Sequence, residues 1–173
     1  MNRLFITIIL VLILSLGFTT ITNAESGSFW FSGGSKDGNG SFAFGFGFDN
    51  IGFEVGVIDD TNTPKGTLDY ECPHWDYTSL GERTTASTVG IDLIGMINLS
   101  NNVTLYGGPG LYWHHTGEIV RSNASGWYYT QSSETTSKIT CSGGIRFKFA
   151  EEARFGIGYH SLRGTNLTFE YLF

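Results

Sequence analysis

The chain has 173 residues, a net charge of −6 and a charged fraction of only 15%, with 24 glycines and 14 phenylalanines. The chain is acidic and has no cluster of basic residues, so we do not expect it to bind nucleic acid. The two cysteines stand in no metal-ligand spacing and suit an exported protein, in which a disulfide is allowed.

Residues 1–24 have the layout of a secretory signal. Arg3 supplies the positive start, residues 4–16 form an apolar run, and Thr22-Asn23-Ala24 places small residues at a cleavage site. The run is shorter than the roughly 20 residues that a membrane-spanning helix needs, so a signal anchor is the lesser alternative. We expect residues 1–24 to direct export and be removed, and residues 25–173 to form one domain.

Eight later segments place apolar residues at every second position, the pattern of a β-strand with one apolar face. The clearest is the last, in which Leu167, Phe169, Tyr171 and Phe173 alternate with other residues. The predicted strands are 28–35, 41–48, 51–58, 86–97, 103–113, 137–149, 154–162 and 166–173.

The connections between these strands differ in length in a regular way. Asp49-Asn50, Leu99–Asn102 and Ala150–Ala153 are tight, whereas Asp59–Thr85 and His114–Thr136 are long. Bacterial outer-membrane barrels have an even number of strands, short periplasmic turns and longer external loops. Counted from a periplasmic N-terminus, every tight turn falls in the periplasm and both long loops fall outside. The sequence therefore predicts an all-β fold, an eight-stranded antiparallel up-and-down transmembrane β-barrel.

The face opposite the apolar rows is rich in glycine and carries charges of both signs. These predicted lumen charges are Glu54, Asp92, Arg146, Lys148 and Glu170. An eight-stranded barrel is just wide enough for its own side chains, so we expect the charges to pair across the lumen. We favour a structural plug over a gate or ion path. A lipocalin-type barrel is the competing fold, but its water-facing side would be rich in lysine and glutamate rather than glycine.

The signal segment, the strand–loop rhythm and the aromatic final strand ending at Phe173 make the chain resemble the small outer-membrane β-barrel superfamily. That superfamily includes the OmpA transmembrane domain and the OmpX/Ail-like and opacity-type proteins. The resemblance covers residues 25–173 and implies a monomer, exported through the periplasm into the bacterial outer membrane, in contact with lipid and lipopolysaccharide. It also implies that the barrel assembly machinery reads Tyr171 and Phe173.

The two predicted loops are the favoured functional region, because loops on a rigid scaffold commonly carry binding function. Their aromatic residues suit contact with an external protein or glycan. These binding candidates are Tyr70, Trp75, Tyr77, Trp127, Tyr128 and Tyr129. The alternative is that they form an interfacial girdle or pack loop on loop. We predict a non-catalytic protein, without a cofactor, that serves adhesion, host or surface contact, or envelope maintenance.

An enzyme is the second hypothesis and a narrow pore the third. His160 and Ser161, with Glu170 on the next strand, resemble the His-x-Ser arrangement and carboxylate of the outer-membrane lipid A deacylases, in which histidine activates a serine nucleophile. Here the two residues are adjacent. Neighbours on a strand point to opposite faces, so they would need a bulge to share a proton.

The sequence holds two further residue pairs that could bind a metal or each other. His114-His115 would need loop carboxylates to hold a metal and lacks spaced ligands, so no metal is predicted. A disulfide between Cys72 and Cys141 would tie the first long loop to the barrel rim, and the sequence leaves this bond open.

Overall fold

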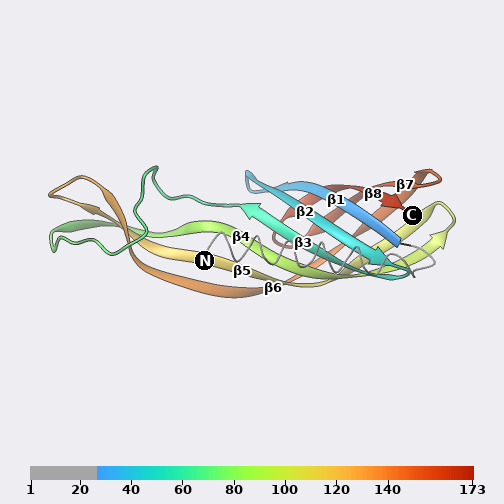
Figure 1. Ribbon diagram of the computed structural model, residues 1–173, viewed down its shortest axis with the longest axis horizontal. Coiled ribbons are helices and arrows are strands. Elements are labelled where there is room, and N and C mark those ends of the chain that lie inside the picture. The colour runs from blue at the N-terminus through green and yellow to red at the C-terminus, as the bar shows by residue number, and fades with distance from the viewer. Residues whose placement is uncertain (1–26) are drawn as a thin grey trace.

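The computed structural model describes residues 27–173, which form a closed antiparallel barrel of eight strands in which β1 also pairs with β8 (Figure 1). The strands are β1 (Gly27–Lys36), β2 (Asn39–Phe48), β3 (Ile51–Asp59), β4 (Tyr77–Ser100), β5 (Val103–Ser122), β6 (Tyr128–Ala150), β7 (Ala153–His160) and β8 (Gly164–Leu172). The predicted fold class is confirmed. The predicted signal segment lies outside the described residues, and residues 27–173 contain no helix long and apolar enough to cross a membrane.

Tight turns close one end of the barrel at the three predicted places. Each leaves two residues between consecutive strands, at Asp49-Asn50, Asn101-Asn102 and Glu151-Glu152. Asp49 has a φ of 52°, a left-handed conformation that aspartate adopts more readily than most residues. The seam between β1 and β8 reaches the same end, where Gly27 and Phe173 exchange two backbone hydrogen bonds of 2.9 Å.

The outer surface of the barrel is apolar. Phe53, Leu93 and Phe169, from three of the predicted outward rows, are 57%, 46% and 46% exposed. Such a continuous apolar surface is unfavourable in water and suits lipid. Strands β1, β2, β3, β7 and β8 have 8 to 10 residues, close to the roughly 9–11 that a tilted membrane strand requires. These observations argue against the lipocalin-type alternative.

Side chains fill the lumen. Trp30 is fully buried and packs with Ile94 and Met96. Glycines on neighbouring strands make room for the large rings: a Cβ at Gly45 would overlap the Trp30 indole.

Three strands run far past the barrel rim. β4, β5 and β6 have 24, 20 and 23 residues, and their outer parts form a three-stranded sheet at the left of Figure 1. We call residues 77–87, 114–122 and 128–138 the distal extension. Its strands remain paired out to Tyr77–Ser122 and Arg121–Tyr128. Ten residues at about 3.3 Å each give a reach of about 33 Å, well beyond a headgroup layer of about 5–8 Å.

The predicted loops at Asp59–Thr85 and His114–Thr136 are therefore wrong in much of their length. Only 60–76 and 123–127 lie outside named strands, and the rest of both segments is sheet. The prediction failed because polar residues occupy both faces of the extension. Without an apolar row, the period-two signal of a strand disappears.

Candidate functional site

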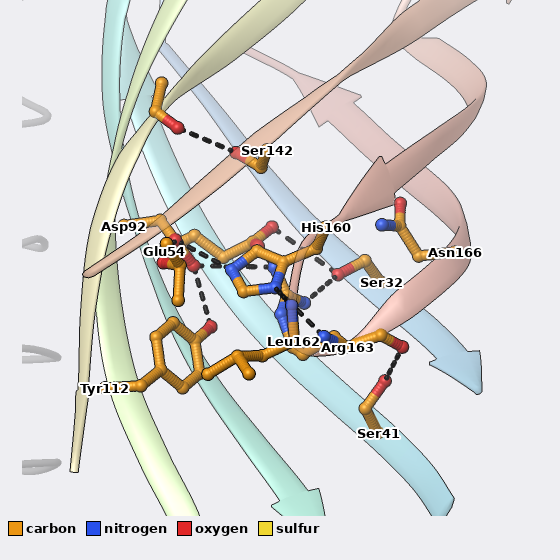
Figure 2. Close-up of polar contacts among 12 residues, drawn as sticks. Ser32, Ser41, Glu54, Asp92, Tyr112, Ser142, His160, Leu162, Arg163 and Asn166 are labelled. Atoms are coloured by element: carbon orange, nitrogen blue, oxygen red, sulfur yellow. Dashed lines mark hydrogen bonds and ion pairs between the residues drawn. The ribbon is translucent and has the colours of Figure 1, made fainter. Parts of the chain in front are cut away.

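A first polar cluster in the lumen is built around Arg163, which lies in the turn between β7 and β8. Its guanidinium forms an ion pair with Glu54 of β3, and its Nη1 donates to Ser32 Oγ of β1 at 3.0 Å (Figure 2). Glu54 Oε2 accepts the Trp30 indole N–H at 2.6 Å. Arg163 and Glu54 are 2% and 5% exposed. Two charges held out of water in this way require each other as partners.

His160 and Asp92 complete this cluster. His160 Nδ1 accepts the backbone N–H groups of Leu162 and Arg163 at 3.1 and 3.0 Å, so this nitrogen carries no proton. The ring is therefore the neutral tautomer, and its Nε2–H donates to Asp92 Oδ1 at 3.0 Å. The Tyr112 hydroxyl donates to Asp92 Oδ2 at 2.7 Å. His160 thus links the β7–β8 turn to the far wall of the barrel.

A second cluster centres on Arg146 of β6. Its Nη1 donates to Glu170 Oε1 at 2.7 Å, and Arg154 donates to the other oxygen of Glu170 at 3.4 Å. The Arg146 guanidinium also lies 4.4 Å from the ring centroids of both Trp30 and Tyr106, where cation–π attraction adds to the ion pair. With His160 neutral, the first cluster has a net charge of −1 and the second of +1, so together they are neutral.

The structure therefore brings four of the five predicted lumen charges into these clusters. Glu54, Asp92, Arg146 and Glu170 are buried there, whereas Lys148 is partly exposed and forms none of the ion pairs found in the described chain. Sequence reasoning missed Arg163, because face assignments were made only for strand residues and Arg163 falls between two strands. It also missed Trp30, although its position between the outward-facing Phe29 and Phe31 indicates the lumen.

The residues of the hydrolase hypothesis do not form a catalytic arrangement. Both ring nitrogens of His160 are already bonded, to the backbone of the β7–β8 turn and to Asp92. Ser161 Oγ accepts the Cys141 backbone N–H at 3.2 Å, and Glu170 is paired with Arg146. The carboxylate beside His160 is therefore Asp92 rather than Glu170, and His160 has no free nitrogen to activate a nucleophile.

The segment 60–76, which we call the strap, connects β3 to β4 and lies alongside the distal extension. At its start Asp60 accepts the Thr88 backbone N–H at 3.0 Å and the Thr88 hydroxyl at 2.7 Å, and lies 3.3 Å from His114 Nδ1. Further along, Leu68 pairs with Tyr129 as an isolated parallel bridge on β6. The strap is thus bonded to the sheet at both places.

The six aromatic binding candidates separate into two groups. Tyr129 is only 5% exposed and contacts Tyr70 edge to face, with centroids 5.5 Å apart, which supports loop packing for this pair. Trp75 and Trp127 lie near the end of the extension and are 101% and 57% exposed. Tyr77 and Tyr128 lie beside them and are exposed and partly exposed. A reach of about 33 Å separates this end from the barrel rim, so these residues are not part of a girdle at its own membrane.

The side chains of His114 and His115 contact different neighbouring strands. His114 Nδ1 lies 2.7 Å from Thr88 Oγ1, whereas His115 Nδ1 lies 2.8 Å from Thr135 Oγ1 on the adjoining strand. Within residues 27–173 no three His, Cys, Asp or Glu side chains gather as metal ligands.

The structure does not contain the possible disulfide, since Cys72 and Cys141 are both free. The backbone N–H of Cys72 donates to the side chain of Gln131, which is ten residues from Cys141 along β6. At about 3.3 Å per residue this is about 33 Å, far beyond the roughly 4.4–6.8 Å Cα separation of a disulfide.

The two residues of the predicted assembly signal lie at the seam. The Tyr171 hydroxyl donates to Glu152 Oε2 at 2.8 Å, and the Phe173 ring lies 6.4 Å from that of Phe29. Their role in assembly stays a prediction.

No protein-family model matches the chain, and no curated protein is significantly similar to it in sequence. Among solved structures it is similar to Ail, the attachment invasion locus protein of Yersinia pestis, with 13% identity, a TM-score of 0.41 and coverage of 86% of this chain and 95% of Ail. A complex of Ail with the heparin analogue sucrose octasulfate gives 12% identity, a TM-score of 0.39 and the same coverages.

Neisserial surface protein A is also similar, with 14% identity, a TM-score of 0.40 and coverage of 85% and 90%. Sequence identities of 12% to 14% do not indicate a shared function, and the fold is assigned from the strand pairing itself.

Proposed function

We propose that the chain is a monomeric, non-catalytic protein of the bacterial outer membrane whose distal extension presents a recognition surface outside the cell. The supporting observation is that β4, β5 and β6 continue beyond the rim as one hydrogen-bonded sheet with unpacked indoles near its end. Trp75 and Trp127 lie outside the strands but within two residues of the starts of β4 and β6, so the sheet fixes the backbone next to both indoles and reduces the ordering that binding requires.

The apolar exterior supports a place in the membrane, and the fold suits export through the periplasm and insertion by the barrel assembly machinery. The short turns carry Asp49, Glu151 and Glu152 at the end opposite the extension, where they would face the periplasm. Lipid and lipopolysaccharide would surround the apolar rows. The bonded state of His160 and the paired lumen charges give no support to a hydrolase or an open pore.

Location and orientation can be tested on intact cells that produce the chain. We expect the protein in the outer-membrane fraction, with heated and unheated samples migrating differently on a denaturing gel. Protease added from outside should cut only within the strap and the extension. Recovery in the soluble periplasmic fraction, or cleavage at 151–152 in intact cells, would contradict the proposal.

A further inference from the structure

The end of the extension is held in place by hydrogen bonds while its aromatic side chains stay unoccupied. The backbone N–H of Asn123 donates to the Asp76 carbonyl at 3.1 Å, and its side-chain amide donates to the Asp76 carboxylate at 2.7 Å. Asp76 and Asn123 thus form a clamp. Trp75 immediately precedes Asp76, and Trp127 is the last residue of the turn 123–127 that Asn123 begins. Neither indole takes part in the ring contacts found within the described chain. We call Trp75, Tyr77 and Trp127, with the clamp, the distal tip.

The charges around the distal tip have one predominant sign. Asp69, Glu71 and Asp76 are exposed in the strap, which also holds the exposed Lys65. Arg121 is a basic residue of the adjoining β5–β6 hairpin. Across the strap and the extension with its turn, seven acidic residues stand against four basic ones. Such a surface repels sulfated or phosphorylated polymers and attracts cations.

The aromatic rings also favour a positively charged ligand, for a reason independent of the carboxylates. The face of an indole is electron-rich and attracts ammonium and guanidinium groups, with tryptophan the strongest of the aromatic side chains. Large exposed aromatics also act as anchors in protein interfaces, where complementary charge around them speeds association.

We propose that the distal tip docks a lysine- or arginine-rich segment of a partner protein, with Trp75 and Trp127 as anchors and the strap carboxylates as the complementary charge. This inference rests on the proposed function, because the partner must meet the extension outside the cell. It is favoured over a neutral glycan or a second membrane because the rings and the carboxylates select the same ligand charge.

The test uses the refolded chain in neutral detergent micelles and a fluorescein-labelled peptide of alternating arginine and glycine, with binding read by anisotropy. We expect Trp75→Ala with Trp127→Ala to weaken binding by about tenfold or more at unchanged protein charge. The matched control is Trp113→Ala, which removes an indole near the barrel rim and should leave binding unchanged. Trp75→Phe with Trp127→Phe keeps aromatic rings and should retain most of the binding.

A second pair of variants tests the charges. Asp69→Asn with Glu71→Gln should weaken binding and reduce its dependence on salt, whereas Glu151→Gln, at the other end of the barrel, should do neither. Heat-modifiable gel mobility establishes that each variant is folded. The proposal is overturned if the peptide does not bind the unaltered chain, or binds the Trp75→Ala, Trp127→Ala variant equally well.

Stronger binding of a heparin fragment, a neutral oligosaccharide or phosphatidylcholine vesicles at these tryptophans would also overturn it. Because the assay is done in detergent, its failure leaves the cellular orientation test untouched. The two proposals can therefore fail separately.

Discussion

His160 accepts the backbone N–H of Arg163, and this single contact couples the end of a strand to the charge that occupies the lumen. The imidazole fixes the β7–β8 turn, and the turn directs the Arg163 guanidinium to Glu54. A residue outside the strands thereby supplies the positive charge that two strand carboxylates, Glu54 and Asp92, both contact. The interior of this barrel is specified by a turn as well as by its strands.

The first prediction concerns that ion pair. Arg163→Met should leave Glu54 buried without its cation and lower the free energy of unfolding by about 3–5 kcal/mol. Glu54→Gln should cost a similar amount, and the double variant should cost less than the two single changes together. Denaturant unfolding in micelles, followed by the heat-modifiable folded fraction, measures all three. Additive costs would mean that the two side chains are solvated separately.

The second prediction concerns the partner of Arg146. Arg146→Met and Glu170→Gln should couple strongly, because the two side chains are 2.7 Å apart and buried. Arg146→Met and Asp92→Asn should add to within about 0.5 kcal/mol, because they share no partner. Glu54 is a poorer control, since Trp30 touches both Glu54 and Arg146. A strong Arg146–Asp92 coupling in the same unfolding assay would contradict the division of the lumen into two clusters.

The barrel could be predicted from sequence because lipid imposes a simple pattern. A row of apolar residues at alternate positions, such as Phe42, Phe44, Phe46 and Phe48, predicts a strand that has lipid on one side. The same alternation indicated which charges face the lumen, and the structure leaves Lys148 outside both lumen clusters. That residue has the inward parity but stands close to the tight turn at 151–152, where a long side chain reaches solvent.

The extension could not be predicted because water on both sides leaves no contrast between faces. In Gln131-Ser132-Ser133-Glu134 every residue is polar, yet all four belong to β6, and the last three pair with β5. The sequence also could not predict that Tyr129 is buried whereas Trp75 and Trp127 are exposed. Tyr129 packs because the strap bridges to it at Leu68, a contact between residues 61 positions apart in the sequence.

The third prediction separates a structural histidine from a catalytic one. His160→Ala should destabilise the barrel by about 1–3 kcal/mol, because Asp92 loses a donor and two backbone N–H groups lose their acceptor. Ser161→Ala should have a much smaller effect on unfolding. Neither variant should change the acyl chains of lipopolysaccharide incubated with the protein and analysed by mass spectrometry. Acyl loss with the unaltered chain, abolished by either change, would restore the hydrolase hypothesis.

The last prediction concerns the two thiols. Cys72 lies in the strap and is partly exposed to water, so a membrane-impermeant maleimide should label it on intact cells. Cys141 lies on the outward apolar row of β6 between Ile139 and Ile145, where lipid or detergent keeps out the water-soluble reagent. Labelling of Cys72→Ser should therefore be slow until the barrel is unfolded by heating, whereas labelling of Cys141→Ser should match the unaltered chain. Mobility on a non-reducing gel should be the same with and without reductant. A shift on reduction, or two thiols that react only after reduction, would show that Cys72 and Cys141 form a bond, and the strap would then have to leave Gln131 and fold back toward the rim.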